Sequence, residues 1–436
     1  MTQSTPTRTP EAAAAPPAVT SRSARVFPWI VFTLSFALLL SDYMVRQVLA
    51  AVFPLLKDEW GLTDTQLGSL TSVVALTVGL LAVPLSILGD RYGRARAVVV
   101  MAVVWCAATL GSALAASYGQ LLATRVLLGV GEAAYGSVGL AIVLALFPAH
   151  RRASLTGAFM AGGLFGAVLG VALGGSLAPH IGWRGSFVAM AVIGLVLAAL
   201  YRAFVDDQKL AAHRYPSEDV VVADHAPRGS ASWTSLVATP AVVLAYVASG
   251  LQLFVAGSLY SWLPSFFNRS YDLTPARAAQ VGAAFIVVMG IGMIACGAVT
   301  DRVARPHPAR AWSTALAFSA LTLALLGAAF LQAPGPAQLV LLALGGFFCA
   351  GTAGPAGVIV ASLTPERLRA TAFGVLTLAN NLLGLAAGPL VTGMLADRLG
   401  LADAMKIVPL VSIAVIVLLV AGRRSHRSRQ ERLQVD

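Results

Sequence analysis

The sequence predicts an all-α membrane protein with twelve transmembrane helices arranged in two six-helix bundles. Of its 436 residues, 58% are hydrophobic and only 11% are charged, whereas soluble domains carry about 25% charged residues. Apolar runs of about 20 residues recur from end to end, and each is long enough to cross a hydrocarbon core of about 30 Å. In addition, the second half of the chain repeats features of the first.

Each helix is expected where an apolar run lies between polar segments. Six runs in the first half predict spans near 27–52, 64–89, 97–116, 119–147, 153–178 and 183–204. Six runs in the second half predict spans near 237–263, 276–300, 311–331, 336–361, 368–396 and 403–421. These spans divide the chain into a first bundle over 27–204 and a second bundle over 235–421.

Three polar segments flank and separate the two bundles. Residues 1–26 are rich in Thr, Ala, Pro and Ser, which predicts a disordered tail. Residues 205–234 form the longest and most polar stretch between spans, so we expect them to be the linker. Residues 422–436 form a basic tail at the other end of the chain.

The basic residues predict the orientation of the chain. With both termini on the cytoplasmic side, 22 of the 30 Lys and Arg residues lie on that side and 6 on the other. Cytoplasmic loops carry such an excess, so we expect cytoplasmic tails and a cytoplasmic linker. The net charge of +11 is thus a topology signal and does not indicate nucleic-acid binding. No glycosylation or organelle signal is evident, which favours a bacterial inner membrane.

Three segments of the first half recur in the second at offsets of about 210 to 217 residues. They are the stretch after the first span, the loop after the second span, and the start of the fifth span. Parallel six-helix repeats are a known transporter architecture, in which the substrate site lies between the halves near the bilayer midplane.

The loop after the second span, SILGDRYGRAR, resembles the signature loop of the major facilitator superfamily. Ser86 stands where that family usually has Gly. The resemblance implies a loop that holds the cytoplasmic ends of helices while the two halves rock, and by analogy a monomer. A basic loop that only fixes orientation is the alternative. The expected gating residues, which include the repeat after the eighth span, are Asp90, Arg91, Gly93, Arg94, Arg96, Asp301 and Arg302.

The fourth span carries RVLLGVGEAAY, which begins at Arg125 and resembles a superfamily motif linked to proton coupling. Together with the stretch RQVLAAVFPLLKDEWGLTDTQLG from Arg46 onward, it is similar to the spinster-like branch, whose members move lysolipids or sphingoid lipids. Members of that branch usually have Asp directly before the Arg of the first helix. Here Val45 occupies that position, and the acid is Asp42. Either Asp42 takes over the role or the coupling scheme differs.

The fifth span resembles the glycine-rich motif associated with antiporters, but Val171 replaces the usual Pro. Small residues at every fourth position also permit close helix packing, so the motif does not by itself indicate antiport. The eleventh span keeps the Pro in GLAAGPL, which predicts a local kink at Gly388–Pro389. The matching residues of the fifth span are Gly157, Gly166, Gly170, Gly174 and Gly175.

Four charged residues fall well inside the first and fourth predicted spans: Asp42, Arg46, Arg125 and Glu132. Asp42 and Arg46 are four apart and can pair, while Gly129 is expected to leave room between Arg125 and Glu132. Charges inside a membrane usually mark substrate or ion pathways. We expect Asp42 or Glu132 to couple protons, and Arg46 or Arg125 to attract an anionic group of the substrate. The alternatives are static ion pairs and arginines that snorkel to the interface.

Polar and aromatic side chains are expected to complete the substrate site. The second half has no charge well inside its spans, so a charged first half would face a mainly apolar second half and suit an amphipathic substrate. Besides the two arginines, the candidate substrate-binding residues are Tyr43, Tyr135, Gln252, Tyr260, Asn380 and Asn381.

These features predict secondary active transport, coupled to protons, of a small organic anion or an anionic, lysolipid-like amphiphile. Symport and antiport, and uptake and export, all stay open. A multidrug-type exporter of apolar or cationic compounds is the alternative, although it predicts cavity acids without basic partners. The sequence has no HExxH, GxSxG or Walker motif, so neither an enzyme nor direct drive by ATP is indicated. We expect no cofactor and no metal; the partners are the substrate, protons and the lipid bilayer.

Overall fold

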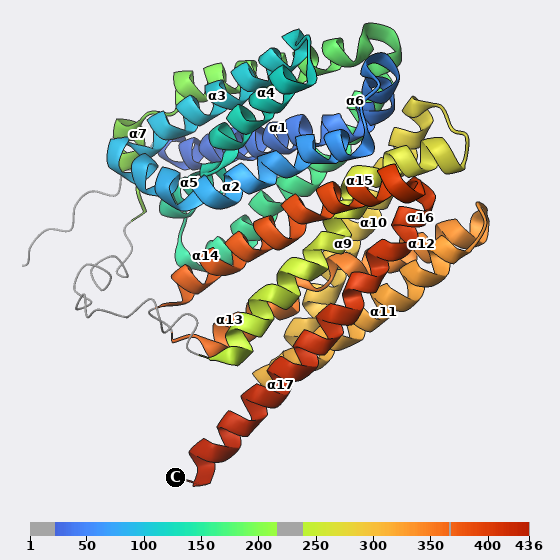
Figure 1. The fold of residues 1–436 in the computed structure, drawn as a ribbon. Coiled ribbons are helices and arrows are strands. Elements are labelled where there is room, and N and C mark those ends of the chain that lie inside the picture. The colour runs from blue at the N-terminus through green and yellow to red at the C-terminus, as the bar shows by residue number, and fades with distance from the viewer. Residues whose placement is uncertain (1–21, 216–238, 366–367, 436) are drawn as a thin grey trace, which may run out of the picture.

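The computed structural model describes residues 22–215, 239–365 and 368–435, and every regular element in these ranges is a helix (Figure 1). Within these ranges, eleven helical stretches are long and apolar enough to cross a membrane. One of them, His150–Phe204, contains Gly182 with φ 70° and is broken there into two spans. The predicted fold class, twelve spans in two bundles, is therefore confirmed.

The first half contains six spans. The fourth span is divided at Ala133–Ala134, directly after Glu132, and the fifth and sixth spans form one element with the break at Gly182. The elements are α1 (Arg22–Trp60), α2 (Asp64–Tyr92), α3 (Arg94–Leu114), α4 (Tyr118–Glu132), α5 (Tyr135–Leu146) and α6 (Ala149–Phe204). A short helix, α7 (Asp207–Ala212), follows within the predicted linker.

The second half repeats this plan, including a division of its fourth span. Its first three spans are α9 (Pro240–Ser270), α10 (Pro275–Ala304) and α11 (Ala311–Leu331), with the single turn η2 (Pro308–Arg310) before α11. The divided span is α12 (Pro336–Ala350) with α13 (Ala353–Leu363). The last two spans are α14 (Arg369–Ala379) with η4 (Asn380–Ala386) and α15 (Ala387–Leu399), then α16 (Leu401–Ile407) with η5 (Val408–Leu410) and α17 (Val411–Val435).

Local sequence explains both ends of α2. The Thr63 hydroxyl accepts a hydrogen bond from the N–H of Gln66 (3.2 Å), and the Gln66 side chain accepts one from the N–H of Thr63 (3.0 Å). This capping box satisfies amides that the first helical turn leaves without partners. At the other end Gly93 has φ 101°, which residues with a Cβ rarely adopt, and it leads the chain directly into α3.

The eleventh span is interrupted by a seven-residue π-helical segment, η4. It lies directly before Gly388–Pro389, where the sequence predicts a kink. Pro389 has no amide hydrogen to donate to the carbonyl of Leu385, so a regular helix cannot continue unchanged through this point. The helical irregularity thus lies in the turns just before the predicted kink, and π-helical segments are frequent at functional sites.

The two halves meet through specific helix pairs. Helix α2 packs against η4 and α15, α6 packs against α10, and α1 contacts α9 and α10. Figure 1 shows α2 beside the long helix that contains α14 and α15. We call the end of the molecule that carries the α1–α2 turn the distal face, and the end that carries α7 the proximal face.

Glycines bring helix backbones together, as the packing interpretation of the fifth-span motif predicts. A Cβ at Gly166 or Gly170 would overlap the backbone of α1, and one at Gly175 would overlap the side chain of Ala279 in the other half. Gly68 of α2 lies equally close to the carbonyl oxygen of Pro389. Small residues therefore permit close contact within the first half and also between the halves near the distal face.

Both ends of the described chain differ from the expected tails. Helix α1 begins at Arg22 and not near 27, and α17 continues through Val435 although 422–436 is polar. Arg, Gln and Glu are good helix formers, so their appearance ends the apolar run without ending the helix. The predicted tail before residue 22 and the linker beyond residue 215 lie outside the described residues.

Candidate functional site

The four charges that the sequence places inside spans form one group in the first half, which we call the central cluster. Asp42 and Arg46 lie on α1, and Arg125 and Glu132 lie on α4. Asp42 and Glu132 are each 4% exposed, Arg125 is 0% exposed, and the Arg46 side chain is 17% exposed. Arg46 is thus the member of the cluster that keeps access to its surroundings.

Arg46 makes an ion pair with Glu132 across the two helices. Its Nη2 lies 2.6 Å and its Nε 3.1 Å from the same carboxylate oxygen, Oε2. The spacing of Asp42 and Arg46 allows a pair within α1; among the described residues, the ion pair of Arg46 is instead with Glu132. Asp42 still interacts electrostatically with both Arg46 and Glu132. The pairing is decided by how α1 and α4 face each other, which spacing along one helix does not reveal.

Arg125 is buried against an aromatic ring. Its guanidinium carbon lies 4.7 Å from the centroid of the Phe187 ring, and its electrostatic interaction is with Glu132. A cation over a ring face is favourable where water is excluded. The side chain is fully covered by protein, so it does not reach an interface as the snorkelling alternative requires.

Several polar atoms of the central cluster are incompletely bonded. Within the described part of the chain, Asp42 Oδ1, Glu132 Oε1, and Nε and Nη2 of Arg125 are buried and have no hydrogen-bond partner. Buried polar atoms are nearly always bonded in proteins, and each exception needs an explanation.

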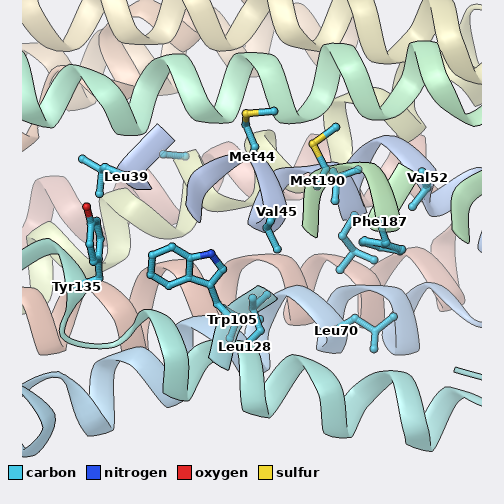
Figure 2. Packing of buried hydrophobic residues seen from close by; sticks show 14 of the residues in the cluster. Leu39, Met44, Val45, Val52, Leu70, Trp105, Leu128, Tyr135, Phe187 and Met190 are labelled. Atoms are coloured by element: carbon cyan, nitrogen blue, oxygen red, sulfur yellow. The ribbon is translucent and has the colours of Figure 1, made fainter. Parts of the chain in front are cut away.

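Val45, the residue before Arg46, and Gly129 of α4 both have packing roles. Val45 is 0% exposed and belongs to the same packed cluster as Trp105, Leu128 and Phe187 (Figure 2). A carboxylate there would have to be buried among these apolar side chains. Gly129 faces Thr77 of α2, where a Cβ would come within 2.7 Å. It therefore brings α4 close to α2, which differs from the expected role of leaving space between charges.

Tyr43 and Tyr260 lie where the halves meet. The guanidinium of Arg46 lies 5.2 Å from the centroid of the Tyr43 ring. Tyr43 of α1 and Tyr260 of α9 both pack against an apolar cluster that joins the halves. The members of that cluster are Ala51, Ala167, Val171, Ala279, Ala283 and Ile286. These two predicted residues, together with Arg46, are brought to the boundary between the halves.

Other predicted residues are not brought to this place. The Tyr135 hydroxyl donates to the carbonyl of Ser35 (2.6 Å), and its ring packs against Trp105, so it lies in the interior of the first half (Figure 2). Gln252 lines a small cavity formed within the second half by α9, α11, α13 and α17. Tyr135 is thus held inside the first bundle and Gln252 inside the second.

The two asparagines of η4 differ from each other. Asn380 accepts a hydrogen bond from the Ser249 hydroxyl through Oδ1 (2.8 Å) and is half-buried. Asn381 donates to the carbonyl of Thr377 (2.9 Å) and packs against Gly79 of α2, where a Cβ would come within 2.9 Å. Asn381 thus contacts the first half directly, whereas Asn380 is tied to α9.

The predicted gating loop is bound by the short helix α7. Asp207 accepts a hydrogen bond from the N–H of Ala95 (2.9 Å) and lies 4.0 Å from Nε of Arg96. Arg91 and Arg96 are exposed, as are Asp301 and Arg302 at the end of α10. The Asp90 side chain lies outside the described part of the structure. Arg94 lines a pocket with residues of α5 and α7.

Four charged residues lie together at the distal face. The sequence places them in loops or at helix ends, and we predicted no functional role for them. Asp64 binds Lys57 of its own half and Arg269 of the other half, and Asp397 binds the start of α2. We call these four residues the distal cluster. These residues are too far apart in the sequence for a local pattern to indicate that they meet. The acidic residue directly after the Thr63 cap marks only the start of α2.

Comparison with known proteins places the chain in a family. A sequence model of the Major Facilitator Superfamily matches residues 34–337. The chain belongs to this superfamily. It is accordingly a multi-pass membrane protein and a secondary transporter of small-molecule substrates, and not an enzyme.

Individual superfamily members agree with the predicted resemblance. The hexuronate transporter of Bacillus subtilis (strain 168) is 25% identical over 372 residues, 82% of this chain and 86% of that protein. The sphingosine-1-phosphate transporter SPNS2 of Danio rerio is 25% identical over 381 residues, 82% of this chain and 74% of that protein. A solved structure of a bacterial homolog of the human lysosomal transporter spinster, inward-facing and occupied, matches with a TM-score of 0.81. It is 20% identical, and the match covers 93% of this chain and 98% of that chain. The resemblance to spinster proteins is thus confirmed.

Proposed function

We propose that this superfamily member couples proton movement to the transport of an organic anion or an anionic amphiphile. The observation that carries the proposal is the ion pair between Arg46, which is partly exposed at the boundary of the halves, and Glu132, which is buried behind it. A guanidinium in this position can bind either the protein's own carboxylate or an anionic group of the substrate.

The proposed coupling is a competition for Arg46. When a substrate anion binds Arg46, Glu132 loses its partner while remaining buried. An unpaired buried carboxylate is unfavourable, and burial favours the neutral form of a carboxyl. Glu132 then takes up a proton, so anion binding and proton binding favour each other. Asp42 lies close enough to interact with Glu132 and is the second candidate proton acceptor.

The relatives support an anionic substrate without fixing its size. One is named for hexuronate and the other for sphingosine-1-phosphate. Tyr43 and Tyr260 add aromatic surface beside Arg46, which suits a substrate that is apolar next to its charged group. An exporter of cationic compounds is the second candidate, and the acids Asp42 and Glu132 would have to serve it while Arg46 holds one of them.

We further propose that both termini are cytoplasmic, so that the distal face lies outside. The distribution of Lys and Arg supports this orientation, since 22 of 30 lie on the side of the termini. The same proposal includes a bacterial inner membrane and a monomer.

The first test is a thermal-shift screen of the purified protein in detergent. One panel holds sugar acids and other small carboxylates, a second holds lysolipids and sphingoid phosphates, and a third holds cationic drugs. Ligands that bind the folded state raise the melting temperature by mass action. A shift with either anionic panel that disappears in Arg46→Gln supports the proposal. A shift with cations alone, kept in Arg46→Gln, contradicts it.

Proton coupling is tested separately in proteoliposomes with the anion that binds. We expect an imposed pH gradient to drive accumulation in the wild type. In Glu132→Gln, exchange of labelled for unlabelled substrate should continue without pH-driven accumulation. If Glu132→Gln and Asp42→Asn both keep pH-driven transport at the wild-type rate, neither carboxyl couples protons.

A further inference from the structure

The distal end of α2 is held by a carboxylate from the other half. The carboxylate of Asp397 accepts a hydrogen bond from the N–H of Asp64 through Oδ1 (2.7 Å) and another from the N–H of Thr65 through Oδ2 (2.9 Å). These amides belong to the first helical turn and have no partner within the helix. A negative charge at a helix N-terminus also interacts favourably with the helix dipole. Asp397 of α15 therefore completes the start of α2 across the boundary.

The Asp64 side chain adds a second bond between the halves. Arg269 of α9 donates to both of its carboxylate oxygens, at 2.8 and 2.7 Å, and Lys57 donates to one of them at 2.7 Å. The Asp64 side chain is only 3% exposed, whereas Arg269 is 28% exposed. A bidentate Arg–carboxylate contact with one partner buried is stronger than an exposed ion pair.

Backbone contacts position these charges. Gly393, one turn before Asp397, faces the carbonyl of Asp64, and Gly68, one turn after Asp64, faces the carbonyl of Pro389. In both places a Cβ would overlap the opposing backbone. The contact is reciprocal, since each helix offers a glycine to the other. The distal cluster thus lies at the point where α2 and α15 come closest.

We propose that the distal cluster closes the distal face of the transporter in this conformation, and that its bonds break each time that face opens. Arg269 and Asp397 act as positioning residues, which set how often the halves separate here and do not touch the substrate. Alternating access requires two states of similar stability, so losing either bond shifts the population toward the distal-open state. This inference needs neither the proposed proton coupling nor the proposed substrate.

Cysteine accessibility in the purified full-length protein tests the proposal. Ala283 is 4% exposed between the halves, so Ala283→Cys should react slowly with a hydrophilic maleimide. The native cysteines Cys106, Cys296 and Cys349 are buried, and the parent protein gives their background. Adding Arg269→Gln or Asp397→Asn should raise the labelling rate by about five- to thirtyfold, the factor that corresponds to one or two kcal/mol. Arg269→Lys keeps the charge but loses the two-pronged geometry, so its rate should be intermediate.

The matched control is Asp403→Asn. Asp403 pairs with Lys406 (2.6 Å) within α16, so this change removes an ion pair at the same face without affecting the boundary. A second measurement places spin labels at the exposed Ala116 and Ala333, one in a distal loop of each half, and reads their distance. We expect a longer-distance population in Arg269→Gln and Asp397→Asn. If both measurements match Asp403→Asn, the distal cluster does not hold the halves together, and the proposal is overturned.

Discussion

The central cluster and the distal cluster both hold two acids and two bases, but they satisfy them differently. The central cluster lies within one half, and atoms of Asp42, Glu132 and Arg125 are buried without hydrogen-bond partners in the described structure. In the distal cluster Asp64 is bonded to Lys57 of its own half and to Arg269 of the other half, and Asp397 also bonds across the halves.

This difference separates two tasks of a transporter. Buried groups with unmet bonds are costly and respond strongly to a proton or a ligand. Fully bonded groups between two rigid bodies stabilise one arrangement of those bodies and gain nothing from a ligand. These contacts support our proposals that the central cluster changes its protonation or its partner, and that the distal cluster holds or releases the halves.

The largest effect is expected from removing Arg46. In Arg46→Gln, Glu132 loses its ion pair while staying buried, which costs on the order of 3–5 kcal/mol. Transport by proteoliposomes should fall at least about a hundredfold, the factor that corresponds to about 2.7 kcal/mol. The control is Arg184→Gln, which breaks the half-exposed pair with Glu59 in the same half and should retain most transport. Equal loss in both variants would show that the central cluster is not special.

The second effect distinguishes the acids of the central cluster. Glu132 is paired with Arg46, whereas Asp42 is not, so competition for Arg46 predicts that Glu132→Gln removes coupling more completely than Asp42→Asn. The ratio of substrate accumulated with and without a pH gradient measures coupling directly. A larger loss of this ratio in Asp42→Asn would instead assign the main proton site to Asp42.

The third effect concerns the glycine contacts behind the distal cluster. Gly68→Ala places a methyl group against the carbonyl oxygen of Pro389, and overpacking of this kind typically costs about 1–3 kcal/mol. We expect faster labelling of Ala283→Cys, as with loss of the distal charges. Gly119→Ala is the matched control, because apart from its chain neighbours and the backbone of its own helical turn no atom lies within 4 Å of the added group. Similar labelling in the two variants would mean that closure tolerates the extra volume.

The smallest effect is expected from an exposed ion pair within a single helix. Lys406 and Asp403 are 44% and 57% exposed and lie three residues apart on α16. Thermal unfolding of Asp403→Asn should differ from that of the wild type by less than about 0.5 kcal/mol, because exposed pairs contribute little. A change as large as that in Arg269→Gln would remove the distinction between surface pairs and the distal cluster.

Much of the fold and part of the candidate site can be predicted from the sequence. Hydropathy locates the spans because each helix must meet lipid over about 20 residues, whatever its neighbours are. Asp42, Arg46, Arg125 and Glu132 stand out for the same reason, since a charge in an apolar run is costly unless it serves a purpose. Gly388–Pro389 predicts an irregular helix because proline lacks a donor wherever it lies.

Other features of the site depend on which helix faces which, and the sequence does not show this. Asp42 and Arg46 have the right spacing to pair, yet Arg46 binds Glu132, 86 residues away. Gln252 and Tyr135 are polar residues in spans, but each turns into its own bundle. Residue type and spacing describe one helix face, and they do not say whether that face meets the partner half or the interior of its own half.

The amino-acid order alone thus accounts for the membrane class, the two repeated bundles and the four charges on the first and fourth spans. These follow from local properties: hydrophobic length, helix periodicity and the cost of burying charge. Tertiary structure decided the partner of Arg46, the packing role of Gly129 and the whole distal cluster. The bond between Asp64 and Asp397 joins residues 333 positions apart. Such a contact exists only after all the intervening helices have packed, so no local pattern in the sequence can specify it.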